Sequence, residues 1–172
     1  MFELAYINED DRAYGLAGMA ISLASLDALD RIDDVFLDAD GPMVNFNHSY
    51  FVSFSPSVSP KSVWNKMLSN LHLTTSLVMS NVMARSIIKF GEEPGSDILD
   101  TLRDLVREEG MEMCSLDADE ADVLFNRAMM QAKRLFMNPR LHPAVAELAE
   151  VITRRRRLTA MDIAEELDLL RL

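Results

Sequence analysis

The chain has a single cysteine and only three histidines among its 172 residues. A lone cysteine, Cys114, excludes an internal disulfide and any metal centre built from several cysteines, and it favours a reducing, cytoplasmic setting. The histidines are His48, His72 and His142. None lies within four residues of another, so the sequence contains no histidine pair spaced to bind a metal from one helix. We therefore expect no metal and no other cofactor.

Positive charge is also scarce, since 17 Lys and Arg residues stand against 28 Asp and Glu residues and the net charge is -11. Binding to nucleic acids and to anionic membranes relies on basic residues, so both partners are disfavoured. No uncharged apolar run reaches the ~18 residues of a membrane-spanning helix. A basic signal-peptide start and a P-loop motif are also missing. The partners that remain are proteins or peptides, among them a second copy of the chain.

What is present is the composition of a globular domain, with 49% hydrophobic and 26% charged residues. We expect one domain over residues 1–172 that is mainly α-helical, with a small β-sheet element between the first and second helices. Residues 1–58 are expected to form the first helix and the β segment. Residues 59–172 are expected to form the helical part.

The first helix is predicted to open at "NEDDR", because acidic residues suit the positive end of the helix dipole. It is expected to run to about Leu29. Short strands are predicted at 32–37 and 43–46, joined by a turn at "DADGP". The stretch "YFVSF", residues 50–54, is a third strand candidate.

Local signals also place the later helices. Ser59 precedes a proline, which is typical of an N-cap followed by proline at the first helical position. A long helix to about Phe90 is expected from there, with an interruption near "LHLTTS". The next helix is predicted to begin near Ile98 and to stop at Gly110, and Pro143 is expected to start a later one.

Two further helix starts carry the side-chain pattern of a capping box. Asp117 with Glu120 predicts one, and Thr159 with Asp162 predicts the last helix. The run "RRRR", residues 154–157, is interpreted as a solvated helix end, where positive charge suits the dipole. Cys114 lies in the acidic stretch "EEGMEMCSLDADE", which does not favour a reactive thiolate. These local patterns assemble no catalytic group.

The stretch "AYGLAGMA", residues 13–20, places two glycines inside a predicted helix, where each costs about 1 kcal/mol relative to alanine. It resembles the "AYHEAGHA" of the peptidase domain of FtsH-type ATP-dependent zinc metalloproteases. That chemistry needs two histidines four residues apart to hold zinc, and a glutamate to activate the bound water. Gly15, Leu16 and Met19 stand at those three positions here. Gly18 matches a glycine of the family and is expected to mark close helix packing.

The resemblance continues in order along the chain. "MARSIIKFGE", residues 83–92, is similar to "GRAAEELVFGE" of the family, and "REEGM" is similar to "TEYGM". "PGSD" is similar to "ASND", which puts Asp97 at the position of the family's third zinc ligand. We interpret Asp97 as a helix N-cap, because one carboxylate without histidines leaves zinc short of three protein ligands.

The resemblance implies a catalytically inactive, stand-alone domain of this type that serves as a binding or regulatory module. The 172 residues contain no ATPase module of the kind that feeds this peptidase in the family. Two alternatives stay open. One is an enzyme with an unrelated active site in the vacated pocket, drawing on Asp97, Tyr14, His48 and His72. The other is a helical adaptor that shares no ancestry with the peptidases.

Overall fold

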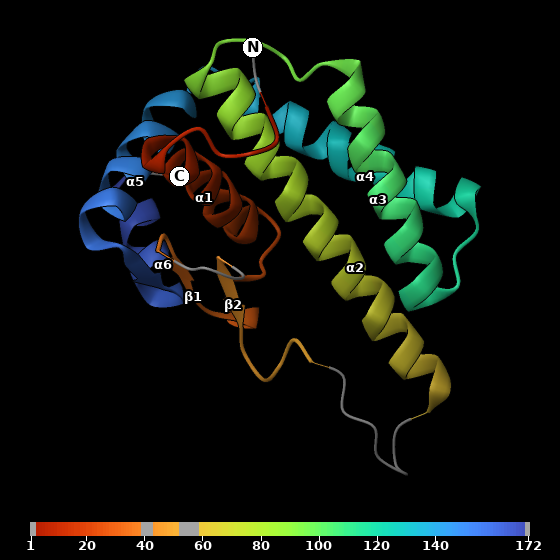
Figure 1. The fold of residues 1–172 in the computed structure, drawn as a ribbon. Coiled ribbons are helices and arrows are strands. Elements are labelled where there is room, and N and C mark those ends of the chain that lie inside the picture. Colours follow the sequence, from red (N-terminus) through yellow and green to blue (C-terminus); the bar gives the residue numbers. More distant parts are fainter. Residues whose placement is uncertain (1–2, 39–42, 52–58, 171–172) are drawn as a thin grey trace.

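The computed structural model describes residues 3–38, 43–51 and 59–170. Within these ranges the protein is mainly helical, with six α-helices and one three-stranded antiparallel sheet. The long helix α2 (Pro60–Met83) runs through the middle of the molecule (Figure 1). Helices α1, α5 and α6 and the sheet lie on one side of it, and α3 and α4 lie on the other. The core therefore continues across both faces of α2.

Helix α1 (Glu9–Ser25) starts where its acidic first turn predicts. The Asn8 side chain caps it by accepting the backbone N–H of Asp11 at 2.9 Å. The helix ends four residues before Leu29, because Asp27 adopts a left-handed backbone with φ 52°. A short 3-10 turn, η1 (Leu29–Arg31), then leads into the sheet.

The sheet has the strand order β2-β1-β3. Strand β1 (Ile32–Phe36) pairs with β2 (Val44–Phe46), as predicted, and also with β3 (Arg157–Thr159). Strand β3 was not predicted, and it corrects the expectation that residues 59–172 are helical throughout. The third strand candidate is wrong at Tyr50 and Phe51, which lie in a turn and a bend. Residues 52–54 of that candidate, and 39–42 of the predicted turn, fall outside the described residues.

Helix α2 begins at the predicted cap, where Ser59 accepts the backbone N–H of Ser62. The predicted interruption at "LHLTTS" is wrong. Thr74 and Thr75 lie within the continuous helix, and their hydroxyls donate hydrogen bonds to the carbonyls of Asn70 and Leu71 one turn back. The helix changes only at its end, where it continues as a single stretch of π-helix, η2 (Ala84–Lys89).

Helices α3 (Ser96–Cys114) and α4 (Ala118–Phe136) follow as a pair. Helix α3 runs past Gly110, where a stop was predicted, and ends at Cys114, because the following residue, Ser115, has a left-handed backbone with φ 55°. Gly110 instead provides room, since a Cβ there would lie 3.3 Å from Leu116 Cδ1. The predicted capping box of Asp117 and Glu120 is confirmed.

Helix α5 (His142–Arg155) and helix α6 (Ala160–Leu169) complete the chain. Pro143 lies in the first turn of α5, as expected, and the capping box of Thr159 and Asp162 is confirmed. The interpretation of "RRRR" as a solvated helix end is confirmed for Arg154 and Arg155, which are exposed in the last turn of α5. It is incomplete for the two arginines that follow. Arg156 forms ion pairs with Glu9 and Asp38, and Arg157 binds Asp34, so this run ties the end of α5 to α1 and the sheet.

Candidate functional site

Gly15 and Gly18 lie where α1 crosses α2 and η2. A Cβ at Gly15 would sit 2.4 Å from Nδ2 of Asn81. A Cβ at Gly18 would sit 2.5 Å from Ala84 Cβ and 2.6 Å from the Ser80 carbonyl oxygen. All three distances are far shorter than any normal contact, so the two glycines allow the helices to approach. Their cost in helix propensity is offset by packing.

The other two motif positions are also part of the packing. Leu16, which stands in place of the glutamate base, has no exposed surface. Met19, in place of the second histidine, is partly buried against the hydrophobic core. Such surroundings suit apolar side chains, because an unpaired charge there would lose its hydration. In α1, the positions that match the zinc motif therefore serve to pack the helix into the hydrophobic core.

Asn81 occupies the space beside Gly15. It is buried, and its Nδ2 donates a hydrogen bond to Tyr6 Oη at 2.9 Å. The Tyr6 ring lies under two guanidinium groups, with Arg85 Cζ 4.4 Å and Arg12 Cζ 5.4 Å from its centroid. Burial raises the pKa of the Tyr6 hydroxyl above its usual value of 10.0. The phenol therefore stays neutral and acts here as a hydrogen-bonding and packing group.

A buried ion pair lies next to this cluster. Arg85 Nε is 2.8 Å from Asp11 Oδ1, and Arg85 Nη2 is 2.6 Å from Asp11 Oδ2. The same guanidinium donates to the backbone carbonyls of Glu3, Leu4 and Ala5 at 2.9–3.0 Å. One side chain from η2 thus fastens both α1 and the segment before it.

Asp97 does not cap α3. The N-cap is Gly95, whose extended backbone precedes the helix, and no side-chain cap bond is present. Asp97 lies one position inside Ser96, the first helical residue, and is exposed. The N-cap interpretation is therefore wrong. Its carboxylate still lies in the first turn, where negative charge suits the helix dipole.

The structure does not gather the residues named for an unrelated active site. Tyr14 lies near Lys89, whose Nζ is 5.0 Å from its ring centroid. His48 is exposed in the turn after β2, whereas His72 lines a pocket between α2 and α4 that contains neither Tyr14, His48 nor Asp97. Cys114 is buried, and burial raises the pKa of its thiol. Among the residues that the structure describes, no three His, Cys, Asp or Glu side chains lie close enough to hold a metal ion.

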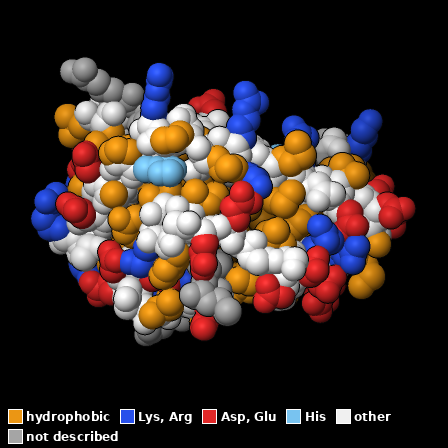
Figure 2. All heavy atoms as spheres, turned by 90° about the horizontal axis from the view of Figure 1, so that it is seen from above, with side chains coloured by type: hydrophobic (Ala, Val, Ile, Leu, Met, Phe, Trp, Pro, Cys, Tyr) orange, Lys and Arg blue, Asp and Glu red, His pale blue; other side chains and the backbone are white. Residues whose placement is uncertain are grey.

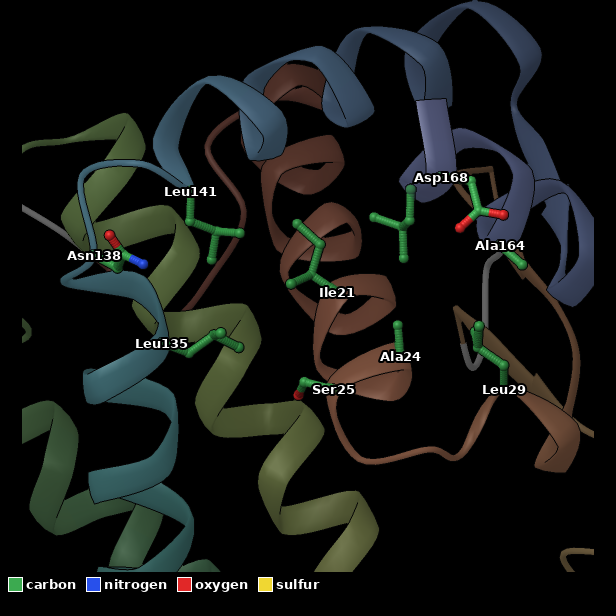
Figure 3. A pocket seen from close by; sticks show the side chains of 10 residues that line it. Ile21, Ala24, Ser25, Leu29, Leu135, Asn138, Leu141, Ala164 and Asp168 are labelled. Carbon is green, nitrogen blue, oxygen red and sulfur yellow. The ribbon is translucent and has the colours of Figure 1, made fainter. Parts of the chain in front are cut away.

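An apolar pocket of about 450 Å³ lies at the C-terminal end of α1, beyond the four motif positions. Figure 3 shows side chains of α1, α4 and α6 facing this shared space. The lining residues are Ile21, Ala24, Ser25, Leu29, Leu135, Asn138, Leu141, Ala164, Leu167 and Asp168. No local pattern in the sequence indicates this open space, because the pocket is formed by segments far apart in the chain.

No family model, curated protein or solved structure matches the chain significantly. In the described ranges, no helix combines the length and the apolar content that crossing a membrane requires. On the face seen in Figure 2, apolar side chains are interspersed with acidic and basic ones.

Proposed function

We propose that the chain is a non-catalytic homologue of the FtsH-type peptidase domain that acts as a binding or regulatory module in the cytoplasm. The ordered series of motif similarities supports the ancestry, as does a small sheet that follows the motif helix. The observation that carries the loss of catalysis is the packing at Gly15. Asn81 fills the space into which a zinc-binding side chain at position 15 would project.

The residues at the other motif positions also support the loss of the peptidase reaction. Catalytic zinc needs three protein ligands and an open position for water. Positions 15 and 19 offer no ligand atoms of that kind, and Leu16 is enclosed in the core. An unrelated enzyme has less support, because the pocket that His72 lines contains none of the other three candidates, Tyr14, His48 and Asp97.

The pocket in Figure 3 is the binding surface that we assign to this function. Its walls are mainly aliphatic, and the polar groups of Ser25, Asn138 and Asp168 lie among them. Pockets of this kind bind ligands by burying apolar groups, while a few polar groups fix their orientation. A protein or peptide partner would insert an apolar side chain here.

The test has two parts. The purified protein is analysed for metal, and labelled casein is incubated with it in added zinc, with and without a chelator. We expect no bound zinc and no cleavage. Stoichiometric zinc together with chelator-sensitive cleavage contradicts the proposal.

Binding is measured as the fluorescence anisotropy of the same casein, an unfolded polypeptide that offers many apolar side chains. Ala164→Trp places an indole in the pocket and should weaken binding. Met161→Trp is the matched control, because this residue lies on the same helix with 71% of its surface exposed. If both substitutions changed casein binding equally, the assignment of this pocket as the binding surface would be contradicted.

A further inference from the structure

A second pocket, of about 520 Å³, lies between the first half of α2 and the beginning of α4. It shares no residue with the pocket in Figure 3. Its lining is apolar along the middle and polar at the ends. The lining residues are Trp64, Asn65, Leu68, Ser69, His72, Leu116, Glu120, Val123, Leu124 and Arg127. Ligand sites in proteins have this size and this mixture of side chains.

One end of the pocket has a fixed aromatic wall. Trp64 Nε1 donates a hydrogen bond to the Cys114 carbonyl oxygen at 3.0 Å, which sets the orientation of the indole. The side chain is nevertheless 43% exposed. Because the indole is held in place, an apolar ligand could pack against it without ordering it first.

The other end has a cation, Arg127, without a counter-ion among the residues that the structure describes. Arg127 forms no ion pair or hydrogen bond with any residue in the described ranges. The pKa of the His72 imidazole is lowered chiefly by burial and additionally by the nearby charge of Arg127. His72 therefore stays neutral near pH 7, and its buried Nε2 has no hydrogen-bond partner among the described residues. Arg127 remains available to an anion.

The only acidic side chain in the lining is at the opposite end. Glu120 lies seven residues before Arg127 on α4, which corresponds to about 10 Å along a helix. Its carboxylate accepts the backbone N–H of Asp117 in the capping box. The two charges make the pocket positive at the His72 end and negative at the Trp64 end. A ligand with one anionic group has one favourable orientation here.

We propose that this pocket binds a single carboxylate attached to an apolar body, with the carboxylate paired to Arg127 and the body lying along Leu68 and Leu124 toward Trp64. The planar guanidinium suits a carboxylate because two parallel hydrogen bonds can form. Trp64 and His72 are eight residues apart on α2, about 12 Å along the helix. A chain of six to eight carbons, or a phenylalkyl group, fits this length. The site is separate from the proposed function and does not depend on it.

A carboxylate attached to an apolar body occurs in two kinds of ligand, a free carboxylic acid and the C-terminus of a peptide with an apolar last residue. Trp64 is the only tryptophan of the chain, so its fluorescence reports directly on the pocket. Hexanoate, 4-phenylbutyrate and the tripeptide acetyl-Gly-Leu-Phe are titrated against the whole protein at pH 7. Hexanamide and the amidated tripeptide are the neutral counterparts.

We expect saturable fluorescence changes with the carboxylates, and binding about tenfold weaker for the amides, because a charge-assisted pair is lost. Binding of the small acids alone identifies a free ligand, and binding of the tripeptide alone identifies a chain end. Either result supports the site. No saturable change with any carboxylate, or equal binding of acids and amides, overturns it.

Arg127→Gln should weaken carboxylate binding about tenfold and leave amide binding unchanged. Arg134→Gln, seven residues further along α4, is the matched control and should change neither. Both arginines are exposed, so neither substitution threatens folding. Unchanged carboxylate affinity in Arg127→Gln contradicts the assigned pairing.

Discussion

Asp11 and Arg85 lie 74 residues apart in the sequence and form a bidentate ion pair from which solvent is excluded. Their side chains have 0% and 1% of their surface exposed. The guanidinium is hydrogen-bonded to the carboxylate and to three carbonyls, so its charge is compensated on several sides. This one side chain joins α1, η2 and the N-terminal segment.

Arg85→Met should destabilise the protein by about 3–5 kcal/mol, because it leaves the Asp11 carboxylate buried without its partner. The free energy of unfolding in urea measures this effect. Asp11→Asn combined with Arg85→Met should recover part of the loss, since neither side chain of the former pair is then charged. Arg140→Met is the control at an exposed arginine and should be nearly neutral. A loss below about 1 kcal/mol in Arg85→Met would contradict the role of the pair.

Gly18→Ala should destabilise the protein even though alanine favours helices. The new methyl group would clash with the backbone of Ser80 as well as with the Ala84 side chain. The backbone cannot relieve the clash by changing a rotamer, as a side chain can. We expect a loss of about 1–3 kcal/mol, typical of overpacking in a core. Thermal and urea unfolding measure it.

Gly15→Ala makes a useful comparison, because the atoms nearest to its new methyl group belong to the side chain of Asn81 and not to the backbone. Asn81→Ala creates room and should recover stability in the Gly15→Ala protein. It should give no recovery in the Gly18→Ala protein. If Asn81→Ala restored stability equally in both proteins, the side chain of Asn81 would not be the specific obstacle at position 15.

Asp162 should contribute stability that disappears in acid. Hydrogen bonds from the Thr159 side chain and backbone, and then the bond to Arg155, lower its pKa from 3.8 to about 2. The folded state therefore binds the proton less tightly than the unfolded state does. The contribution is complete above pH 3.8 and is lost as the pH falls toward 2.

Asp162→Ala tests this contribution. At pH 7 it should cost about 1 kcal/mol, as the loss of a helix cap does. The difference from the unsubstituted protein should shrink when unfolding is measured at decreasing pH between 4 and 2. A difference that stays constant over that range would contradict the low pKa.

His72 should titrate below its ordinary pKa of 6.5, chiefly because it is partly buried and additionally because of the charge of Arg127. Arg127→Gln removes the second cause and should raise the pKa toward 6.5 without reaching it. Proton NMR of the imidazole C2 signals measures the change, and Arg134→Gln should leave the pKa of His72 unaltered. A neutral histidine favoured by folding also means that stability falls as the pH drops below 6.5. That fall should be smaller in Arg127→Gln.

The sequence predicted those features whose cause lies within a few residues. Ser59 caps α2 by reaching a backbone N–H three residues ahead, and the box at Asp117 works over the same distance. The signal and the contact are then in one short stretch. The same reasoning failed at Asp97, because Gly95 and Asp97 are both acceptable caps and their local residues do not decide between them.

Features that depend on distant partners could not be predicted. Strand β3 is three residues long, and it exists because β1 offers an edge to it. The roles of Arg156 and Arg157 depend on carboxylates more than a hundred residues away. For the candidate sites, the sequence identified the altered motif positions, but it gave no sign that Asn81 fills the space beside Gly15.

The central position of β1 also has a consequence for how the protein is made. A ribosome completes β1 and β2 long before it reaches Arg157, which binds Asp34 across a separation of 123 residues. Until then one edge of β1 has unpaired backbone groups that invite contact with other chains. Translation that pauses before residue 157 would prolong this exposure. Newly made, incomplete chains should therefore depend on chaperones far more than the finished protein does.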